Sequence, residues 1–232
     1  MTHDTRADSA VPHADLAAAV AEGTEGRLLL THPFYRRWEA GELEPQELAE
    51  YAVHYRAFEA VLPAVLSAVA DRLAADGADA AADLVNRNLA DELGSPRPHL
   101  ELFDDFAAAL PDRPGATTPG PAAVDLAATY RRLADQSPVA AIAGLAAYET
   151  QAAAIATTKG DGLRRWYGLD ADGTAFWDVH ATMDADHGDW AVEALGLLDA
   201  DPAEVADASR CAADAWWALL DEREAEGAVA VG

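Results

Sequence analysis

The sequence predicts an all-α protein that folds as a single domain. Apolar residues recur at helical spacing along almost the whole chain, and Ala, Leu, Glu and Arg dominate, while runs of Val, Ile and Thr typical of strands are missing. A chain of 232 residues with 51% hydrophobic content can bury one sizeable core. We therefore expect one helical bundle with one active site.

The N-terminal half is divided by short polar segments and by Pro and Gly. Residues 1–12 are polar and are predicted to form a disordered tail, so that the domain spans 13–228. Helices are predicted at 13–30, 33–40, 44–75, 78–93 and 97–110. Gly41 closes the second of these and Pro45 suits the first turn of the third, while "GSPRP" interrupts the helical pattern at 94–98.

The C-terminal half contains a single loop rich in Pro and Gly, "PDRPGATTPGP" at 111–121, and a turn, "LDADG" at 169–173. Between and after these segments, helices are predicted at 121–135, 138–159, 161–167, 172–196 and 202–227. The chain has no internal repeat and no composition shift that would mark a second domain.

The net charge of -25 comes from 41 acidic residues against 16 basic ones. Such a surface repels nucleic acid and anionic membranes, so neither is expected as a partner. Fifteen of the basic residues are Arg and only one, Lys159, is Lys. Excess acid with almost no lysine is typical of proteins that work in concentrated salt, where charge repulsion is screened, and we expect a halophilic source. An ordinary acidic protein from an Arg-rich genome is the alternative.

The cellular compartment is indicated by cysteine usage and by the lack of long apolar stretches. Cys211 is the only cysteine, which excludes an internal disulfide and a four-cysteine zinc site and fits a reducing compartment. No stretch reaches the roughly 18 apolar residues that span a bilayer, and the first residues have no signal-peptide core. We expect a soluble, cytoplasmic protein.

The segment "HATMDADH" at 180–187 is the first candidate for a metal site. On a helix, His180, Asp184 and His187 lie within about 60° of one another, on one face. Imidazole nitrogen and carboxylate oxygen suit a transition metal, and Asp184 with His187 repeats the acid-x-x-His step of di-iron bundles. An acid-rich chain can also produce this pattern by chance, so further ligands are required.

Two other segments offer such ligands. "LADELGSPRPHLELF" contains Glu92 and His99 on either side of a helix break, and "LAAYETQAAAIATTK" contains Glu149 among apolar residues. Burial of Glu149 would require a neutralising cation or partner, although a place on the polar edge of its helix is equally compatible with the pattern. Three histidines and three carboxylates could hold two metal ions with positions open for oxygen.

The order of these six residues resembles the ligand pattern of the haem-oxygenase-like di-metal oxidases. The resemblance also covers "HPFYRRWEAGEL" (32–43), "YAVHYRAF" (51–58), "DELGSPRPH", "YETQ" and "DADH". It implies a haem-oxygenase-like (TenA-like) bundle, a homodimer and two metal ions, Fe/Fe or Fe/Mn, that react with dioxygen and an external reductant. The ligands that it implies are Glu92, His99, Glu149, His180, Asp184 and His187.

Within that family the chain most resembles the self-sacrificing para-aminobenzoate synthases. Tyr35, in "FYRRWEAGEL", matches the tyrosine whose ring becomes the product, and Lys159, ten residues after Glu149, matches the lysine that supplies the amino nitrogen. The resemblance also places Tyr51 and Tyr148 as electron relays or pocket residues. Packed core aromatics and a helix-end cation are the structural alternatives, but an arginine would serve a helix end as well as the chain's only lysine.

These observations favour a di-metal oxidase that makes para-aminobenzoate for folate synthesis from its own tyrosine. One alternative is a multi-turnover di-iron oxidase or oxygenase acting on a small amino or fatty acid, which needs the metals but neither Tyr35 nor Lys159. Another is a non-enzymatic, metal-binding or regulatory bundle. A thiaminase-like enzyme would need a cysteine in the central helices, and Cys211 lies in the last predicted helix.

Overall fold

The computed structural model describes residues 13–94, 97–110 and 118–230, without the side chains of 184, 185 and 228–230. Every regular element in these ranges is a helix, which confirms the all-α prediction. The disordered tail predicted at 1–12 lies outside the described residues. The elements are α1 (His13–Gly23), the 3-10 turn η1 (Leu29–Thr31), α2 (Pro33–Ala40), α3 (Pro45–Glu59), α4 (Leu62–Ala75), α5 (Asp79–Gly94), α6 (His99–Ala109), α7 (Pro121–Gln136), α8 (Pro138–Tyr167), α9 (Ala171–Leu197) and α10 (Pro202–Ala230).

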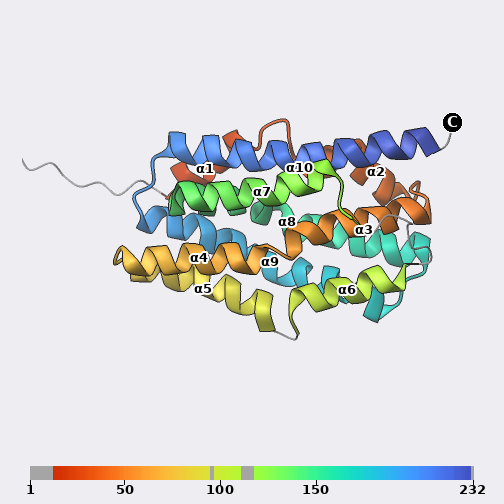
Figure 1. Ribbon diagram of the computed structural model, residues 1–232, viewed down its shortest axis with the longest axis horizontal. Helices are drawn as coiled ribbons and strands as arrows, with labels where there is room; N and C mark the ends of the chain where they lie inside the picture. The colour runs from red at the N-terminus through yellow and green to blue at the C-terminus, as the bar shows by residue number, and fades with distance from the viewer. Residues whose placement is uncertain (1–12, 95–96, 111–117, 231–232) are drawn as a thin grey trace, which may run out of the picture.

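The helices form a layered bundle around α8. In Figure 1, α10 runs along one long side of the molecule and α4 and α5 lie on the opposite side. Helix α8 makes its most extensive contacts with α9 and α10. It is also long and apolar enough to pass a composition test for a membrane span, contrary to our expectation that no stretch would, but 72% of its most apolar window is buried inside the protein. Its alanine-rich surface therefore serves close helix packing in the core.

Two predicted helices are shorter than expected. The prediction of one helix over 44–75 is wrong, because α3 ends at Glu59 and α4 begins at Leu62. Pro63 has no N–H to donate to the carbonyl of Glu59, four residues earlier, so a continuous helix would lose a hydrogen bond and clash there. The prediction of a helix over 13–30 is also wrong: α1 ends at Gly23, and Gly26 takes a left-handed φ of 72° in the turn that follows.

The helices predicted at 138–159 and 161–167 are one continuous helix, α8. Gly160 and Gly162 do not break it, because they are positions of close packing rather than turns. A Cβ atom on Gly162 would lie 3.0 Å from Cδ1 of Trp38 on α2, so only glycine admits this approach without a shift. The helix ends at Gly168, whose φ of 69° is left-handed.

Candidate functional site

Three predicted metal ligands from three helices converge in the core. Glu92 lies near the end of α5, His99 begins α6, and His180 lies in the middle of α9; all three are buried. One ligand atom from each lies within 4.8 Å of the others, and Nδ1 of His99 is 3.1 Å from a carboxylate oxygen of Glu92. The break between α5 and α6 thus brings residues from either side of "GSPRP" to one point.

The two histidines of this cluster have the properties of metal ligands. Nδ1 of His180 lies 2.8 Å from the Phe176 carbonyl, which can only accept, so Nδ1 carries the proton and Nε2 keeps a lone pair. Burial lowers the pKa of His180 to about 3 and also lowers the pKa of His99, which keeps both rings neutral. Among the described residues, neither ring nitrogen of His99 has a partner with hydrogen-bond geometry, although Nδ1 lies close to Glu92. A neutral imidazole oriented by a backbone carbonyl is typical of a metal site.

Glu149 and His187 form a second part of the site. Glu149 is buried rather than on the polar edge of α8, which resolves the alternative that the sequence left open. Its Oε2 is 3.8 Å from Nδ1 of His187, and its Oε1 accepts a hydrogen bond from Asn88 at 3.4 Å. Nε2 of His187 lies 3.1 Å from Asp91, a carboxylate partner of the kind that orients metal-binding histidines. Asp184 lies on α9 between the two histidines, but its side chain is outside the described residues.

The two parts are close enough to influence each other electrostatically. Burial raises the pKa of Glu92 to about 7, and the nearby imidazole of His187 acts in the opposite direction on that pKa. Glu149 likewise influences the pKa of His99. The predicted ligands, as far as their side chains are described, therefore belong to one buried site.

Glu59, the last residue of α3, is a further acid at this site that the sequence did not indicate. Its side chain is only 2% exposed, and its Oε2 has no hydrogen-bond partner among the described residues. Burial, and then the charge of Glu92, raises the pKa of Glu59 to about 8. The signal in the sequence is an acidic residue four positions before Pro63 in an otherwise apolar stretch. Asn88 and Asp91 were also missed.

These residues fit divalent transition-metal ions. Three carboxylates, those of Glu59, Glu92 and Glu149, are buried together beside histidines that burial keeps neutral. Burying ionised carboxylates is costly unless cations neutralise them, and mixed imidazole and carboxylate ligands are those that iron and manganese accept. The site therefore has the chemistry of a metal centre rather than of a packed core.

Lys159 lies at the centre of a second buried cluster. Its side chain is 1% exposed, and its Nζ donates hydrogen bonds to Oη of Tyr35 at 2.8 Å and to Oη of Tyr51 at 2.6 Å. The same nitrogen lies 4.4 Å from the ring centroid of Trp177. Burial lowers the pKa of Lys159 well below its usual value, which favours the neutral amine. The helix-end alternative for Lys159 does not apply, because the residue is inside α8 and buried.

A row of tyrosines connects this cluster with the candidate metal centre. The hydroxyls of Tyr35 and Tyr51 are 2.7 Å apart, and those of Tyr55 and Tyr148 are also 2.7 Å apart. The rings of Tyr51 and Tyr55, one turn apart on α3, have centroids 5.5 Å from each other. Tyr148 directly precedes Glu149 in the sequence. The row therefore runs from Lys159 and Tyr35 to Tyr148, the neighbour of Glu149 on α8.

Comparison with known sequences identifies a family for this chain. Residues 49–220 match the family described as iron-containing redox enzymes, and the chain belongs to that family. A 4-aminobenzoate synthase of Nitrosomonas europaea is 35% identical over 211 residues, covering 85% of this chain and 86% of the relative. A 4-aminobenzoate synthase of Chlamydia pneumoniae is 31% identical over 202 residues, covering 84% and 89%.

Solved structures share the fold. A CADD-like protein of unknown function from Nostoc punctiforme superposes with a TM-score of 0.74 at 17% identity, covering 93% of this chain and 98% of that one. A TenA homologue from Pseudomonas syringae gives a TM-score of 0.73 at 17% identity, covering 91% and 90%. The predicted TenA-like, all-α bundle is confirmed.

Proposed function

We propose that this chain makes para-aminobenzoate from the ring of Tyr35 and the side-chain nitrogen of Lys159, using dioxygen at a two-metal site. The observation that carries the proposal is the hydrogen bond of 2.8 Å from Nζ of Lys159, the chain's only lysine, to Oη of Tyr35. Two relatives at 35% and 31% identity bear the name 4-aminobenzoate synthase, which supports this product. The product would serve folate synthesis.

The contact between Lys159 and Tyr35 suits the amination step. Para-aminobenzoate carries nitrogen on the ring carbon that holds the hydroxyl in tyrosine, so the nitrogen donor must reach that carbon. Nζ already lies beside the hydroxyl, and its lowered pKa supplies a lone pair. Aromatic rings around Nζ exclude water, which would otherwise compete with the amine.

The product's atoms define which bonds must change. Its carboxyl carbon corresponds to Cβ of Tyr35, so the Cα–Cβ bond breaks, a glycine residue remains at position 35, and Cβ is oxidised to the carboxylate. The ring C–O bond breaks with its oxygen leaving as water, and the Cε–Nζ bond of Lys159 breaks with Cε left as an aldehyde. These changes remove six electrons; two molecules of dioxygen accept eight, and an external reductant supplies the other two. Since neither residue is restored, each chain acts once.

The metal ions, Fe/Fe or Fe/Mn, would be held by the six predicted ligands. When bound, they supply activation of dioxygen. The chain's own residues hold the ligands ready: the Phe176 carbonyl fixes the ring of His180, and Asp91 fixes that of His187. The proposed ligands are Glu92, His99, Glu149, His180, Asp184 and His187.

Tyr51 and Tyr148 are proposed to relay electrons between the metal site and Tyr35. Oxidation of a buried tyrosine requires a proton acceptor, because burial raises the pKa of Tyr35 and disfavours its anion. The hydroxyl of Tyr51 and the amine of Lys159 are both in hydrogen-bond contact with Tyr35. The ring contact of Tyr51 with Tyr55, and the hydrogen bond of Tyr55 with Tyr148, continue this route.

Isotope labelling tests the nitrogen donor directly. Because Lys159 is the only lysine, protein grown with 15N-lysine carries the side-chain label at one residue. We expect the labelled nitrogen in the para-aminobenzoate formed after iron, manganese, reductant and air are supplied. Unlabelled product would refute the role of Lys159.

A Tyr35→Phe variant separates the proposal from a multi-turnover oxidase, because an oxidase acting on an external substrate would keep its activity. A chain that takes up neither iron nor manganese would fit only the non-enzymatic alternative. The thiaminase-like alternative lacks support, because the only cysteine, Cys211, is exposed on α10.

We further propose that the protein is a cytoplasmic homodimer from a salt-rich cell. The charge of -25 and the single lysine support the salt-rich setting. Light scattering at high and low salt measures the assembly, and a monomer at both would contradict the dimer.

A further inference from the structure

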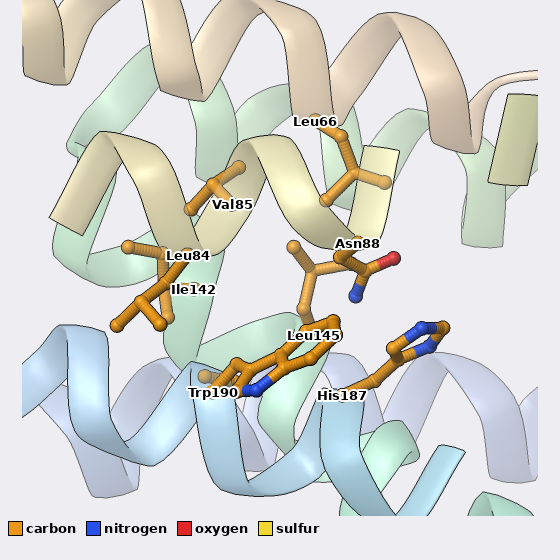
Figure 2. Close-up of a pocket in the computed structure, with 9 residues that line it drawn as sticks. Leu66, Leu84, Val85, Asn88, Ile142, Leu145, His187 and Trp190 are labelled. Atoms are coloured by element: carbon orange, nitrogen blue, oxygen red, sulfur yellow. The ribbon is translucent and has the colours of Figure 1, made fainter. Parts of the chain in front are cut away.

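A small apolar pocket lies beside the candidate metal centre, between α4, α5, α8 and α9. It is lined by Leu66, Leu84, Val85, Asn88, Ile142, Leu145, His187, Trp190 and Ala191. Figure 2 shows Asn88 and His187 together at one end, with Leu84, Val85 and Ile142 toward the other. His187 is therefore both a proposed metal ligand and part of the pocket wall.

The pocket and the Lys159 cluster lie on opposite sides of the metal site. Along α8, the pocket residues Ile142 and Leu145 come before Glu149, and Lys159 comes after it. Helix α9 runs antiparallel, since His187 lies near Glu149 while Trp177 lies near Lys159. A molecule in the pocket can thus approach the metal site without passing the amine.

The size of the pocket limits what it can hold. The space open to the centre of a water-sized molecule is about 20 Å³, and roughly 10–15 Å³ suffices for one water. An amino acid or a fatty acid does not fit. The polar residues of the wall are Asn88, His187 and Trp190, but the Asn88 amide already donates to Glu149 and Nε2 of His187 is paired with Asp91. The wall is therefore poor in groups for the roughly three hydrogen bonds that an ordered buried water typically makes.

We infer that this pocket is a binding site through which dioxygen reaches the metal centre, an inference that rests on the proposed function. Dioxygen is small, uncharged and apolar, and apolar cavities take up such molecules readily. Trp190 forms the outer wall: its ring is half-buried, lies 5.4 Å from that of His187 and is contacted by Arg87. Dioxygen that enters here reaches the metal site without any movement of the aromatic rings that surround Lys159.

Xenon provides a test that does not depend on turnover. Crystals of the full-length, metal-loaded protein under xenon pressure should show xenon against Leu84 and Ile142, because xenon occupies the small apolar cavities that dioxygen enters. An Ala191→Phe variant should fill the pocket and lose this site. The matched control is Ala175→Phe, at a half-buried alanine of α9 outside the pocket. Absence of xenon from the wild-type pocket would overturn the inference.

Oxygen kinetics provide the second test. In stopped-flow mixing of the reduced, metal-loaded protein with dioxygen, Ala191→Phe should lower the second-order rate constant at least tenfold. Its metal content and its final yield of product per chain should be unchanged, and the Ala175→Phe control should react at the wild-type rate. An unchanged rate in a variant that has lost the xenon site would overturn the inference. Should Ala191→Phe fail to fold, Val85→Phe fills the same pocket.

The outcomes separate this inference from the proposed function. A chain whose oxygen consumption depends on Ala191, but which forms no para-aminobenzoate, would refute the product and retain the oxygen site. A chain that forms para-aminobenzoate at the same rate in the wild type and in the pocket variants would refute the oxygen site and retain the product.

Discussion

Replacing Lys159 tests whether the fold holds this side chain as a neutral amine. The nitrogen is buried among aromatic rings and donates to two tyrosine hydroxyls. Lys159→Met removes these two hydrogen bonds, but the hydroxyls of Tyr35 and Tyr51 remain bonded to each other at 2.7 Å. At about 1 kcal/mol for each lost hydrogen bond, partly offset by the apolar thioether, the free energy of unfolding should fall by no more than about 2 kcal/mol.

Lys159→Arg should lower the free energy of unfolding much more than Lys159→Met does, although arginine is a basic residue like lysine. A guanidinium stays protonated in proteins, and burying an uncompensated charge costs about 3–5 kcal/mol. The acid that acts on Lys159 electrostatically, Glu59, is itself shifted toward its neutral form. We therefore expect the wild type to be the most stable, the Met variant to be less stable and the Arg variant to be the least stable. Neither variant should form para-aminobenzoate.

Urea unfolding at fixed salt measures the stabilities, and chromatography of the released aromatic acid measures the product. Arg131→Met, at an exposed site on α7, is the control and should change stability by less than about 0.5 kcal/mol. An Arg variant as stable as the wild type would refute a neutral amine at this position. Product from the Met variant would refute nitrogen donation.

Three other predictions concern charge. Burial raises the pKa of Glu59 from the usual 4.5 to about 8. Between pH 4.5 and pH 8, the metal-free folded protein therefore keeps a proton on Glu59 that the unfolded chain has released. The free energy of unfolding should fall as pH rises through this range, by at most about 5 kcal/mol. Glu59→Gln should flatten this fall in urea unfolding of chelated protein; an unchanged slope would contradict the assignment. Asp91→Asn should weaken metal binding about 10–100-fold in competition with a chelator, because Asp91 orients His187; wild-type affinity would show that the contact is dispensable. Molar KCl should raise the melting temperature by screening the net charge of -25, and scanning calorimetry showing no rise would contradict the halophilic interpretation.

The sequence predicted the helical class and the site where local spacing determines geometry. His180 and His187 share a face of α9 because they are seven residues apart on one helix, and the structure places both in the buried site. Glu92 and Glu149 of other helices were candidates from their local sequence, but only the family resemblance joined them to the histidines in one ligand set. No local pattern reveals which faces of separate helices meet.

The parts that the sequence missed depend on tertiary packing. Glu59 is buried because α3 ends there and turns its last residue toward the site, which the prediction of a continuous helix over 44–75 concealed. The sequence pattern predicts a break between two helices at position 160, yet α8 is continuous there, and Gly160 and Gly162 admit Trp177 and Trp38 against it. The cage around Lys159 likewise draws residues from α2, α3 and α9 that lie far apart in the chain.

The consumption of Tyr35 is the central claim, and intact-protein mass spectrometry with peptide mapping tests it most directly. After exposure to iron, manganese, reductant and air, the peptide containing Tyr35 should lose the mass of a tyrosine side chain, in proportion to the para-aminobenzoate released and never beyond one equivalent per chain. Para-aminobenzoate in excess of the protein, or formed while that peptide keeps its full mass, would contradict the account.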